Sequence, residues 1–284
     1  MPTITKQTTR APIPTSKPKP SGNGVLDRLA SGWSTTDYLK MLLYGSSGTG
    51  KTTLWATFPG PILVLLCSGG NKPGELKSVD TPEYRKKIRP VVIPSIADMK
   101  EVLREASGYA TVVLDHASGF QDLTLREILG LEELPAQKSW GMATQQQYGA
   151  SSLMCKDVFR TMLNLDCNVV IVAQERTFGE EGASEIISPT IGAALTPSVT
   201  GWLGPACDYV VQTFKRPRME RMVNKIGGKE VVTYKRGKGV EYCLRTEDHD
   251  VYQNKFRRPD GKTRAMPECI VDPSYDKILK LIKG

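Results

Sequence analysis

Residues 45–52 of this chain read Gly-Ser-Ser-Gly-Thr-Gly-Lys-Thr, which matches the pattern G-x-x-x-x-G-K-[ST]. The apolar run Leu39–Tyr44 before it predicts a buried strand, and Thr52–Phe58 after it predicts a helix. In this arrangement backbone N–H groups surround a phosphate chain, Lys51 reaches the β- and γ-phosphates, and the Thr52 hydroxyl binds Mg²⁺. The segment therefore predicts a site for ATP and Mg²⁺, and its flanking elements argue against an ordinary glycine-rich turn. The predicted nucleotide contacts are Gly45, Ser46, Ser47, Gly48, Thr49, Gly50, Lys51, Thr52 and Thr53.

Short apolar runs alternate with helix-length segments between about residues 39 and 206. These runs are often β-branched and apolar on both faces, as strands buried in a parallel sheet must be. They are Leu39–Tyr44, Ile62–Leu66, Val91–Ile93, Val112–Leu114 and Val169–Ala173. Helical spacing predicts helices over Ile96–Ala106, Phe120–Leu129 and Gln147–Leu163. The alternation predicts an α/β domain with a mostly parallel central sheet and right-handed crossovers.

The pattern changes after about residue 207, where strand-like segments follow one another. They are Asp208–Phe214, Arg221–Asn224, Glu230–Tyr234 and Val240–Arg245. Gly227-Gly228 and the run 236–239 are turn signals, and Pro273 predicts a final helix with an apolar face formed by Tyr275, Ile278, Leu279 and Ile282. We therefore predict one domain over residues 25–284, with a core at 39–206 and an antiparallel extension of its sheet at 207–284.

Positive charge is concentrated in residues 212–264. This segment holds fifteen Lys or Arg and seven Asp or Glu, so it accounts for the whole net charge of +8. A localised basic surface suits contact with nucleic acid, although solvated strand faces are often basic for no special reason. The cations that we predict to contact nucleic acid here are Lys215, Arg216, Arg218, Lys235 and Arg236.

Two further strands end in polar residues that could meet the triphosphate. Asp115 follows the buried run Val112–Leu114, where a carboxylate would be costly unless it faced an ion at the strand's end, so we predict that it holds Mg²⁺ with Thr52. The alternative is a helix N-cap, and the two roles could coexist. Gln174 follows Val169–Ala173 and could sense the γ-phosphate, or it could be an ordinary loop residue.

Composition excludes several classes of protein. Hydrophobic residues make up 39% and charged residues 24% of the chain, which is typical of a globular protein. No stretch approaches the roughly 20 apolar residues that span a bilayer, and the N-terminus lacks the apolar segment of a secretory signal, so we expect a cytoplasmic protein with no membrane partner. Residues 1–24 are predicted to be a disordered, basic, Pro- and Thr-rich tail. The six cysteines are spread singly, which favours reduced thiols over a zinc site.

The order of these elements resembles the RecA-like P-loop ATPases, and more closely the small phage-encoded P-loop proteins of the single-strand-annealing recombinase group. The residues that carry the resemblance are GSSGTGKTT (45–53), VVLD (112–115), VVIVAQER (169–176) and the segments 188–216 and 242–284. The resemblance implies ATP bound between subunits of a homo-oligomeric ring or filament, with single-stranded DNA as a partner. It also makes a single-strand-binding protein a candidate partner, and the bacterial host cytoplasm the location if the chain is phage-encoded.

The resemblance also implies roles for individual residues. A Lys-x-Arg in this family commonly reaches the neighbouring subunit's γ-phosphate, and here it falls on Lys255 and Arg257. The alternative is that both simply belong to the basic segment.

Two loops of the family face DNA, and we place them around Lys138 and Trp140 and over residues 176–189, with Arg176 and Phe178. An aromatic ring beside cations suits stacking on unpaired bases, although Trp140 would be equally ordinary in a core.

One departure from the family concerns the residue that activates the attacking water. RecA-like enzymes usually place a Glu just after the second strand, but here Cys67 and Ser68 follow that strand and the next carboxylate is Glu75. Either Glu75 or Glu175 substitutes, or hydrolysis is slow and ATP acts chiefly as an assembly switch.

Three functions remain open from the sequence. The leading one is an ATP-dependent recombination protein, with ATPase activity, that assembles on single-stranded DNA and promotes annealing or strand exchange. The second is a nucleotide-gated DNA-binding module with little hydrolysis. The third is a nucleotide or small-molecule kinase, against which the basic, strand-rich final third argues.

Overall fold

A computed structural model describes residues 38–67, 74–131, 143–179, 189–226, 229–258 and 265–283. All of them belong to one compact unit, Tyr38–Gly284. The predicted tail, residues 1–24, lies outside the described residues. Among the described helices, none has both the length and the apolar character needed to cross a membrane.

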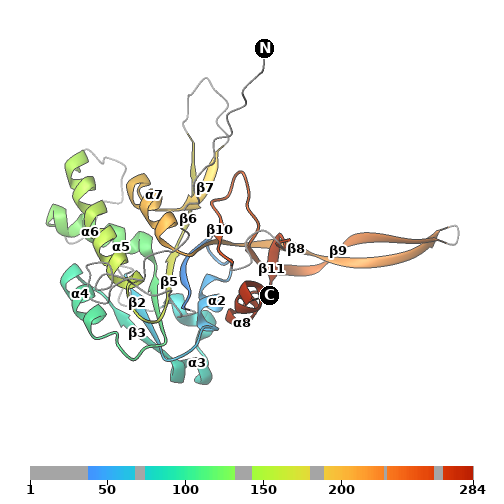
Figure 1. Cartoon of the computed structure of the whole chain (residues 1–284), viewed down its shortest axis with the longest axis horizontal. Helices are drawn as coiled ribbons and strands as arrows, with labels where there is room; N and C mark the ends of the chain where they lie inside the picture. Colours follow the sequence, from blue (N-terminus) through green and yellow to red (C-terminus); the bar gives the residue numbers. More distant parts are fainter. Residues whose placement is uncertain are drawn as a thin grey trace, which may run out of the picture. The chain divides into compact units, whose positions relative to one another are not determined.

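The centre of this unit is a sheet whose parallel part has strands at the five predicted runs, although the third strand is Ile88–Val92 rather than Val91–Ile93 (Figure 1). Its strands are β1 (Lys40–Tyr44), β2 (Ile62–Leu66), β3 (Ile88–Val92), β4 (Thr111–Asp115) and β5 (Asn168–Ala173). They lie side by side in the order β1-β5-β4-β2-β3, all parallel. Because β5 lies between β1 and β4, residues that follow these three strands meet at one edge of the sheet.

Helices cover both faces of this sheet. The larger apolar core forms under α4 (Ile96–Arg104), α5 (Ala117–Leu129), α6 (Gln145–Leu163) and α7 (Pro197–Ala206). The other face packs against α2 (Lys51–Ala56) and α8 (Tyr275–Lys283). Two short helices, η1 (Gly74–Val79) and α3 (Pro82–Lys87), connect β2 to β3. Strand residues alternate between the two cores, as the two-residue period of a strand requires.

Antiparallel strands extend the sheet beyond β1. Strand β8 (Tyr209–Ile226) starts parallel to β1 and then pairs along its length with β9 (Lys229–Arg245). Strands β10 (Lys255–Phe256) and β11 (Cys269–Val271) pair with β8 and β9. The predicted fold class, an α/β domain with a mostly parallel sheet and an antiparallel extension, is confirmed. The apolar face of α8 packs on the sheet as predicted, although the helix begins at Tyr275 rather than Pro273.

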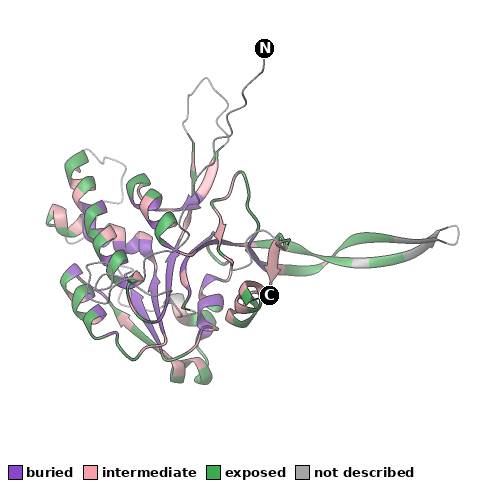
Figure 2. Ribbon diagram, in the orientation of Figure 1, coloured by how far each residue is buried: buried purple, intermediate pink, exposed green. Residues whose placement is uncertain are grey.

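Beyond the body of the sheet, β8 and β9 continue as a long two-stranded arm (Figure 1). We call residues 212–217 and 240–245 the arm root, and residues 218–226 with 229–236 the distal arm. The root includes buried residues, whereas the described side chains of the distal arm are exposed (Figure 2).

The structure corrects three expectations for this part of the chain. The run 236–239 is not a turn: β9 continues through it, and a register shift opposite Pro217 and Met219 absorbs the extra residues. The four separate short strands expected after residue 207 belong to β8 and β9. A two-stranded sheet of β6 (Glu175–Phe178) and β7 (Thr190–Ala193), followed by α7, was not expected.

Candidate nucleotide site

The phosphate loop joins β1 to α2 and needs glycine at three positions. Gly45, Gly48 and Gly50 have φ angles of 155°, 71° and 89°, which residues with a side chain rarely adopt. A Cβ on Gly45 would also clash with the Thr213 carbonyl oxygen of β8. The loop is therefore shaped both by its own glycines and by the neighbouring strand.

Lys51 lies at the centre of the loop. Its Nζ donates to the carbonyl oxygens of Gly45 at 2.7 Å and Ser46 at 2.8 Å. Burial lowers the pKa of Lys51, and the carboxylates of Asp115 and Glu175 oppose that effect. A desolvated ammonium held among backbone amides suits the binding of a polyphosphate.

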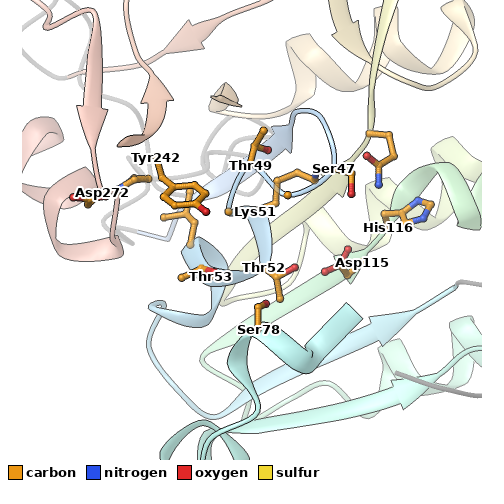
Figure 3. A pocket seen from close by; sticks show the side chains of 15 residues that line it. Ser47, Thr49, Lys51, Thr52, Thr53, Ser78, Asp115, His116, Tyr242 and Asp272 are labelled. Atoms are coloured by element: carbon orange, nitrogen blue, oxygen red, sulfur yellow. The ribbon is translucent and has the colours of Figure 1, made fainter. Parts of the chain in front are cut away.

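Thr52 and Asp115 face each other across the cavity beside the loop (Figure 3). Asp115 ends β4 and is buried, and its Oδ2 accepts a hydrogen bond from Trp55 Nε1 at 3.1 Å. A hydroxyl and a carboxylate are oxygen donors of the kind that Mg²⁺ prefers, so the residues present fit this ion. The helix N-cap expected near Asp115 is instead His116, whose Nδ1 accepts from the Gly119 N–H at 2.9 Å.

The cavity has a volume of about 750 Å³ and extends along the loop. The predicted contacts Ser47 to Thr53 line it, together with Asp115 and Gln174. Gly45 and Ser46 form the start of the loop and are not part of the cavity wall. Sequence reasoning missed six lining residues. Leu54 directly follows the predicted contact Thr53 and Ser78 belongs to η1, and the remaining four are His116, Tyr242, Asp272 and Pro273. His116 directly follows Asp115 and could have been found from that position, whereas the other three come from distant segments.

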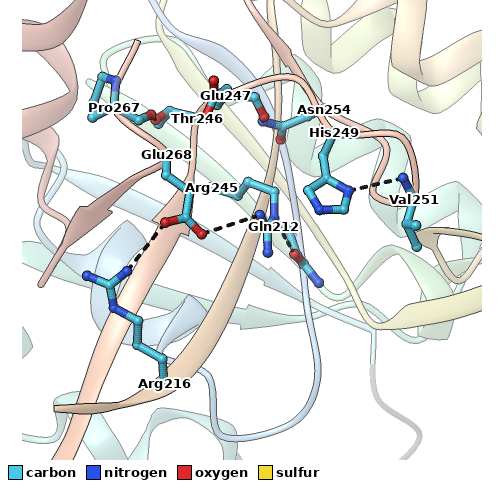
Figure 4. Close-up of polar contacts among 10 residues, drawn as sticks. All are labelled: Gln212, Arg216, Arg245, Thr246, Glu247, His249, Val251, Asn254, Pro267 and Glu268. Atoms are coloured by element: carbon cyan, nitrogen blue, oxygen red, sulfur yellow. Dashed lines mark hydrogen bonds and ion pairs between the residues drawn. The ribbon is translucent and has the colours of Figure 1, made fainter. Parts of the chain in front are cut away.

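Glu175 lies behind the phosphate loop, not among the residues that line the cavity. Its carboxylate accepts hydrogen bonds from the Ser46 hydroxyl and from Gln212 Nε2, the latter at 3.1 Å. Gln212 in turn accepts from Arg245 Nε at 3.1 Å, and Arg245 and Arg216 both approach Glu268 (Figure 4). A chain of polar contacts therefore runs from the loop to the arm root. The side chain of Glu75 and the whole of Ser68 lie outside the described parts.

Lys255 and Arg257 make contacts within their own chain. Lys255 Nζ donates to the carbonyl oxygens of Gly204, Pro205 and Cys207 at the end of α7, and burial lowers its pKa. Arg257 pairs with Asp208 at 2.6 Å. Both residues also line a second cavity, of about 730 Å³. The structure does not bring them to the phosphate loop, and their predicted role toward a neighbouring subunit stays a prediction.

The residues predicted to contact nucleic acid are dispersed. Lys138 and Trp140 fall outside the described residues. On β6, the Arg176 guanidinium lies over the Phe178 ring at 5.6 Å. Lys215, Arg218, Lys235 and Arg236 are exposed on the arm, whereas Arg216 pairs with Glu241 at 3.0 Å and Glu268 at 3.6 Å.

The sequence family described as "AAA domain" matches residues 37–258, which include the phosphate loop, Asp115 and the arm. The chain belongs to this AAA domain family. The match covers most of the chain and agrees with a P-loop nucleotide-binding domain.

Three solved structures are similar to this AAA domain protein at low identity. The flagellar accessory protein FlaH from Methanocaldococcus jannaschii is 11% identical, with 83% of this chain and 86% of that chain covered and a TM-score of 0.39. A KaiC-like protein from Pyrococcus horikoshii is 12% identical, with 83% and 89% covered and a TM-score of 0.39. The RadB recombinase is 14% identical, with 74% and 89% covered and a TM-score of 0.38. Curated protein sequences contain no match to this chain.

Proposed function

We propose that this AAA domain protein binds ATP with Mg²⁺ at the phosphate loop and uses the bound nucleotide to control binding of single-stranded DNA by the β8–β9 arm. The observation that carries the proposal is that the arm begins at the loop itself. Thr213 Oγ1 lies 2.7 Å from Thr49 Oγ1, and a Cβ on Gly48 would lie 3.8 Å from Lys215 Nζ. A change at the loop therefore reaches the arm through direct contacts.

The chain's own residues have separable tasks at this site. Loop amides and Lys51 hold the phosphates, while Thr52 and Asp115 hold the ion, which neutralises charge on the β- and γ-phosphates when bound. Gln174 follows β5, between the loop and β4, and its backbone oxygen accepts from Ala194 at 2.7 Å. This contact supports a role for Gln174 in linking the γ-phosphate end of the cavity to the residue that follows β7.

The finer assignment is to a phage-type recombination protein that assembles as a ring or filament and promotes annealing or strand exchange. Its support is the sequence resemblance together with the exposed cations of the arm. Cations on an exposed two-stranded ribbon attract a polyanion through counterion release.

A nucleotide-gated module with little hydrolysis is the second candidate. It is favoured by the position of Glu175, whose carboxylate is bonded to Ser46 and Gln212 behind the loop. Among the described residues that line the cavity, the carboxylates are Asp115 and Asp272.

The test measures Mg-ATP affinity, then anisotropy of a labelled single-stranded oligonucleotide with and without a non-hydrolysable ATP analogue, then phosphate release. The proposal predicts tighter DNA binding with the analogue in the wild type and no such response in Lys51→Ala. DNA-stimulated phosphate release would identify an ATPase; a nucleotide response without release would identify the gated module. DNA affinity that is the same with and without the analogue would contradict both candidate functions.

A further inference from the structure

The cavity is longer than the triphosphate site requires, and its two ends differ. Asp115 and His116 lie at one end, while Tyr242 and Asp272 lie at the other, with Lys51 between (Figure 3). Lys51, Thr52 and Asp115 mark where the β- and γ-phosphates and the ion bind. The α-phosphate and the nucleoside must then extend in the opposite direction, past Thr53.

At that opposite end an aromatic ring is held against the loop. A Cβ on Gly50, the last glycine before α2, would lie 3.3 Å from Tyr242 Cδ1 and 3.8 Å from Cγ. The residue nevertheless remains 41% exposed and lines the cavity, so its side chain is accessible to a ligand. An aromatic face that borders a polar cavity suits stacking on a planar ring.

The backbone of Tyr242 is firmly positioned. In β9 it pairs with Lys215, its carbonyl oxygen accepts from the Asp272 N–H at 2.7 Å, and buried Cys243 and Leu244 follow it. A residue whose backbone is held in this way needs little backbone ordering when a ligand stacks on its ring.

We infer that Tyr242 forms the nucleobase subsite, so that the arm root supplies one wall of the nucleotide site. This inference rests on the proposed function, because it takes the orientation of the nucleotide from the phosphate loop. It adds that the base is recognised by a residue of the arm rather than by the α/β core.

The experiment compares Mg-ATP with Mg-tripolyphosphate, which has the phosphates but no base, by calorimetry. The variants are Tyr242→Leu, Tyr242→Phe and, as a matched control, Tyr234→Leu, which removes a 65% exposed tyrosine from the distal arm. We expect Tyr242→Leu to weaken Mg-ATP binding about tenfold through lost stacking and to leave tripolyphosphate affinity within twofold. Tyr242→Phe and Tyr234→Leu should both bind Mg-ATP like the wild type.

Retained tripolyphosphate binding in Tyr242→Leu also shows that the variant is folded. Equal loss of both ligands would mean that Tyr242 only supports the loop, and no loss of either would mean that the base lies elsewhere; each result overturns the inference while leaving the proposed function intact. Failure of the wild type to bind Mg-tripolyphosphate and Mg-ATP would instead overturn the proposed function, and the subsite with it.

Discussion

The phosphate loop and the distal arm differ in what holds them in place. The loop is enclosed by the sheet, by α2 and by the root of β8, and Lys51 and Thr49 are both buried there. The distal arm consists of two paired strands whose described side chains are exposed, including Met219, Val223 and Tyr234 (Figure 2). A two-stranded hairpin without a covered face is marginally stable in water. The packed body of the protein, together with the arm root, therefore determines the geometry of the loop, whereas the distal arm depends on its root.

The root links these two regions. Gln212, Thr213 and Arg245 are buried, and they contact Glu175, Thr49 and Glu268 in turn. Arg245 also lies over the rings of Phe214 at 4.7 Å and Tyr252 at 4.4 Å, which fixes its guanidinium. The comparison predicts that substitutions in the loop affect both nucleotide and DNA binding, that substitutions in the distal arm affect DNA alone, and that substitutions in the root have intermediate effects.

Lys51→Ala should have the largest effect. Removing the ammonium that the loop holds should weaken Mg-ATP binding by at least about 100-fold, since it deletes the charged contact to the β- and γ-phosphates. Calorimetry with Mg-ATP measures this directly. Lys86→Ala, which removes an exposed lysine from α3, is the matched control and should bind like the wild type. Comparable affinity for Lys51→Ala would show that the loop does not hold the triphosphate.

Much of this site could be predicted because its signal is local in sequence. The spacing of Gly45, Gly48, Gly50 and Lys51 is sufficient for the loop, and an acid at the end of a buried apolar run points to Asp115. Tyr242, Asp272 and Thr213 could not be found in this way. They reach the loop only because β8 pairs with β1 and because β9 pairs with β8 and β11. Pairing between strands that are distant in sequence cannot be predicted from the local sequence pattern.

The arm was predicted as strands but with the wrong connections. Gly237 and Gly239 are ordinary turn signals, yet they lie within β9 because the register shift near Pro217 and Met219 absorbs them. Glycine in a strand marks either a turn or a bulge, and only the pairing partner distinguishes the two. The basic character of the segment was evident from its sequence, but the continuous length of β8 and β9 was not.

Removing the distal arm should have the next largest effect. Replacing residues 218–239 by Asn-Gly joins Pro217 to Val240 through a two-residue hairpin turn and keeps the root. We expect affinity for single-stranded DNA to fall about tenfold or more at low salt, with a shallower salt dependence, because the seven Lys or Arg of this segment are lost, four of them exposed among the described side chains. Mg-ATP affinity, measured on the same sample, should stay within about threefold, which also serves as the control for folding. Unchanged DNA affinity would show that DNA binds to another part of the protein.

Thr213→Val tests whether the root supports the loop. The Thr213 hydroxyl lies 2.7 Å from that of Thr49, and Thr213 is 1% exposed. Loss of this hydroxyl leaves the buried Thr49 hydroxyl with one partner fewer, at a cost of about 1 kcal/mol. If this cost destabilises the nucleotide-binding conformation of the loop, it corresponds to roughly fivefold weaker Mg-ATP binding. Thr233→Val, on the exposed distal arm, should leave Mg-ATP affinity unchanged. A fall in melting temperature without any change in affinity would show that the root stabilises the fold but not the loop.

Arg216→Gln and Arg218→Gln should have the smallest effects, and in different assays. Arg218 is exposed, so its loss should weaken DNA binding about threefold, as expected for one phosphate contact. Arg216 is already paired with Glu241 and Glu268, and its loss leaves the largely buried Glu241 carboxylate without that partner. Arg216→Gln should therefore lower the free energy of unfolding by up to about 1 kcal/mol, which is measured as a slightly lower melting temperature. Its DNA affinity should be unchanged. Equal weakening of DNA binding by the two variants would show that the root contacts DNA as the distal arm does. It would contradict the assignment of DNA binding to the distal arm alone.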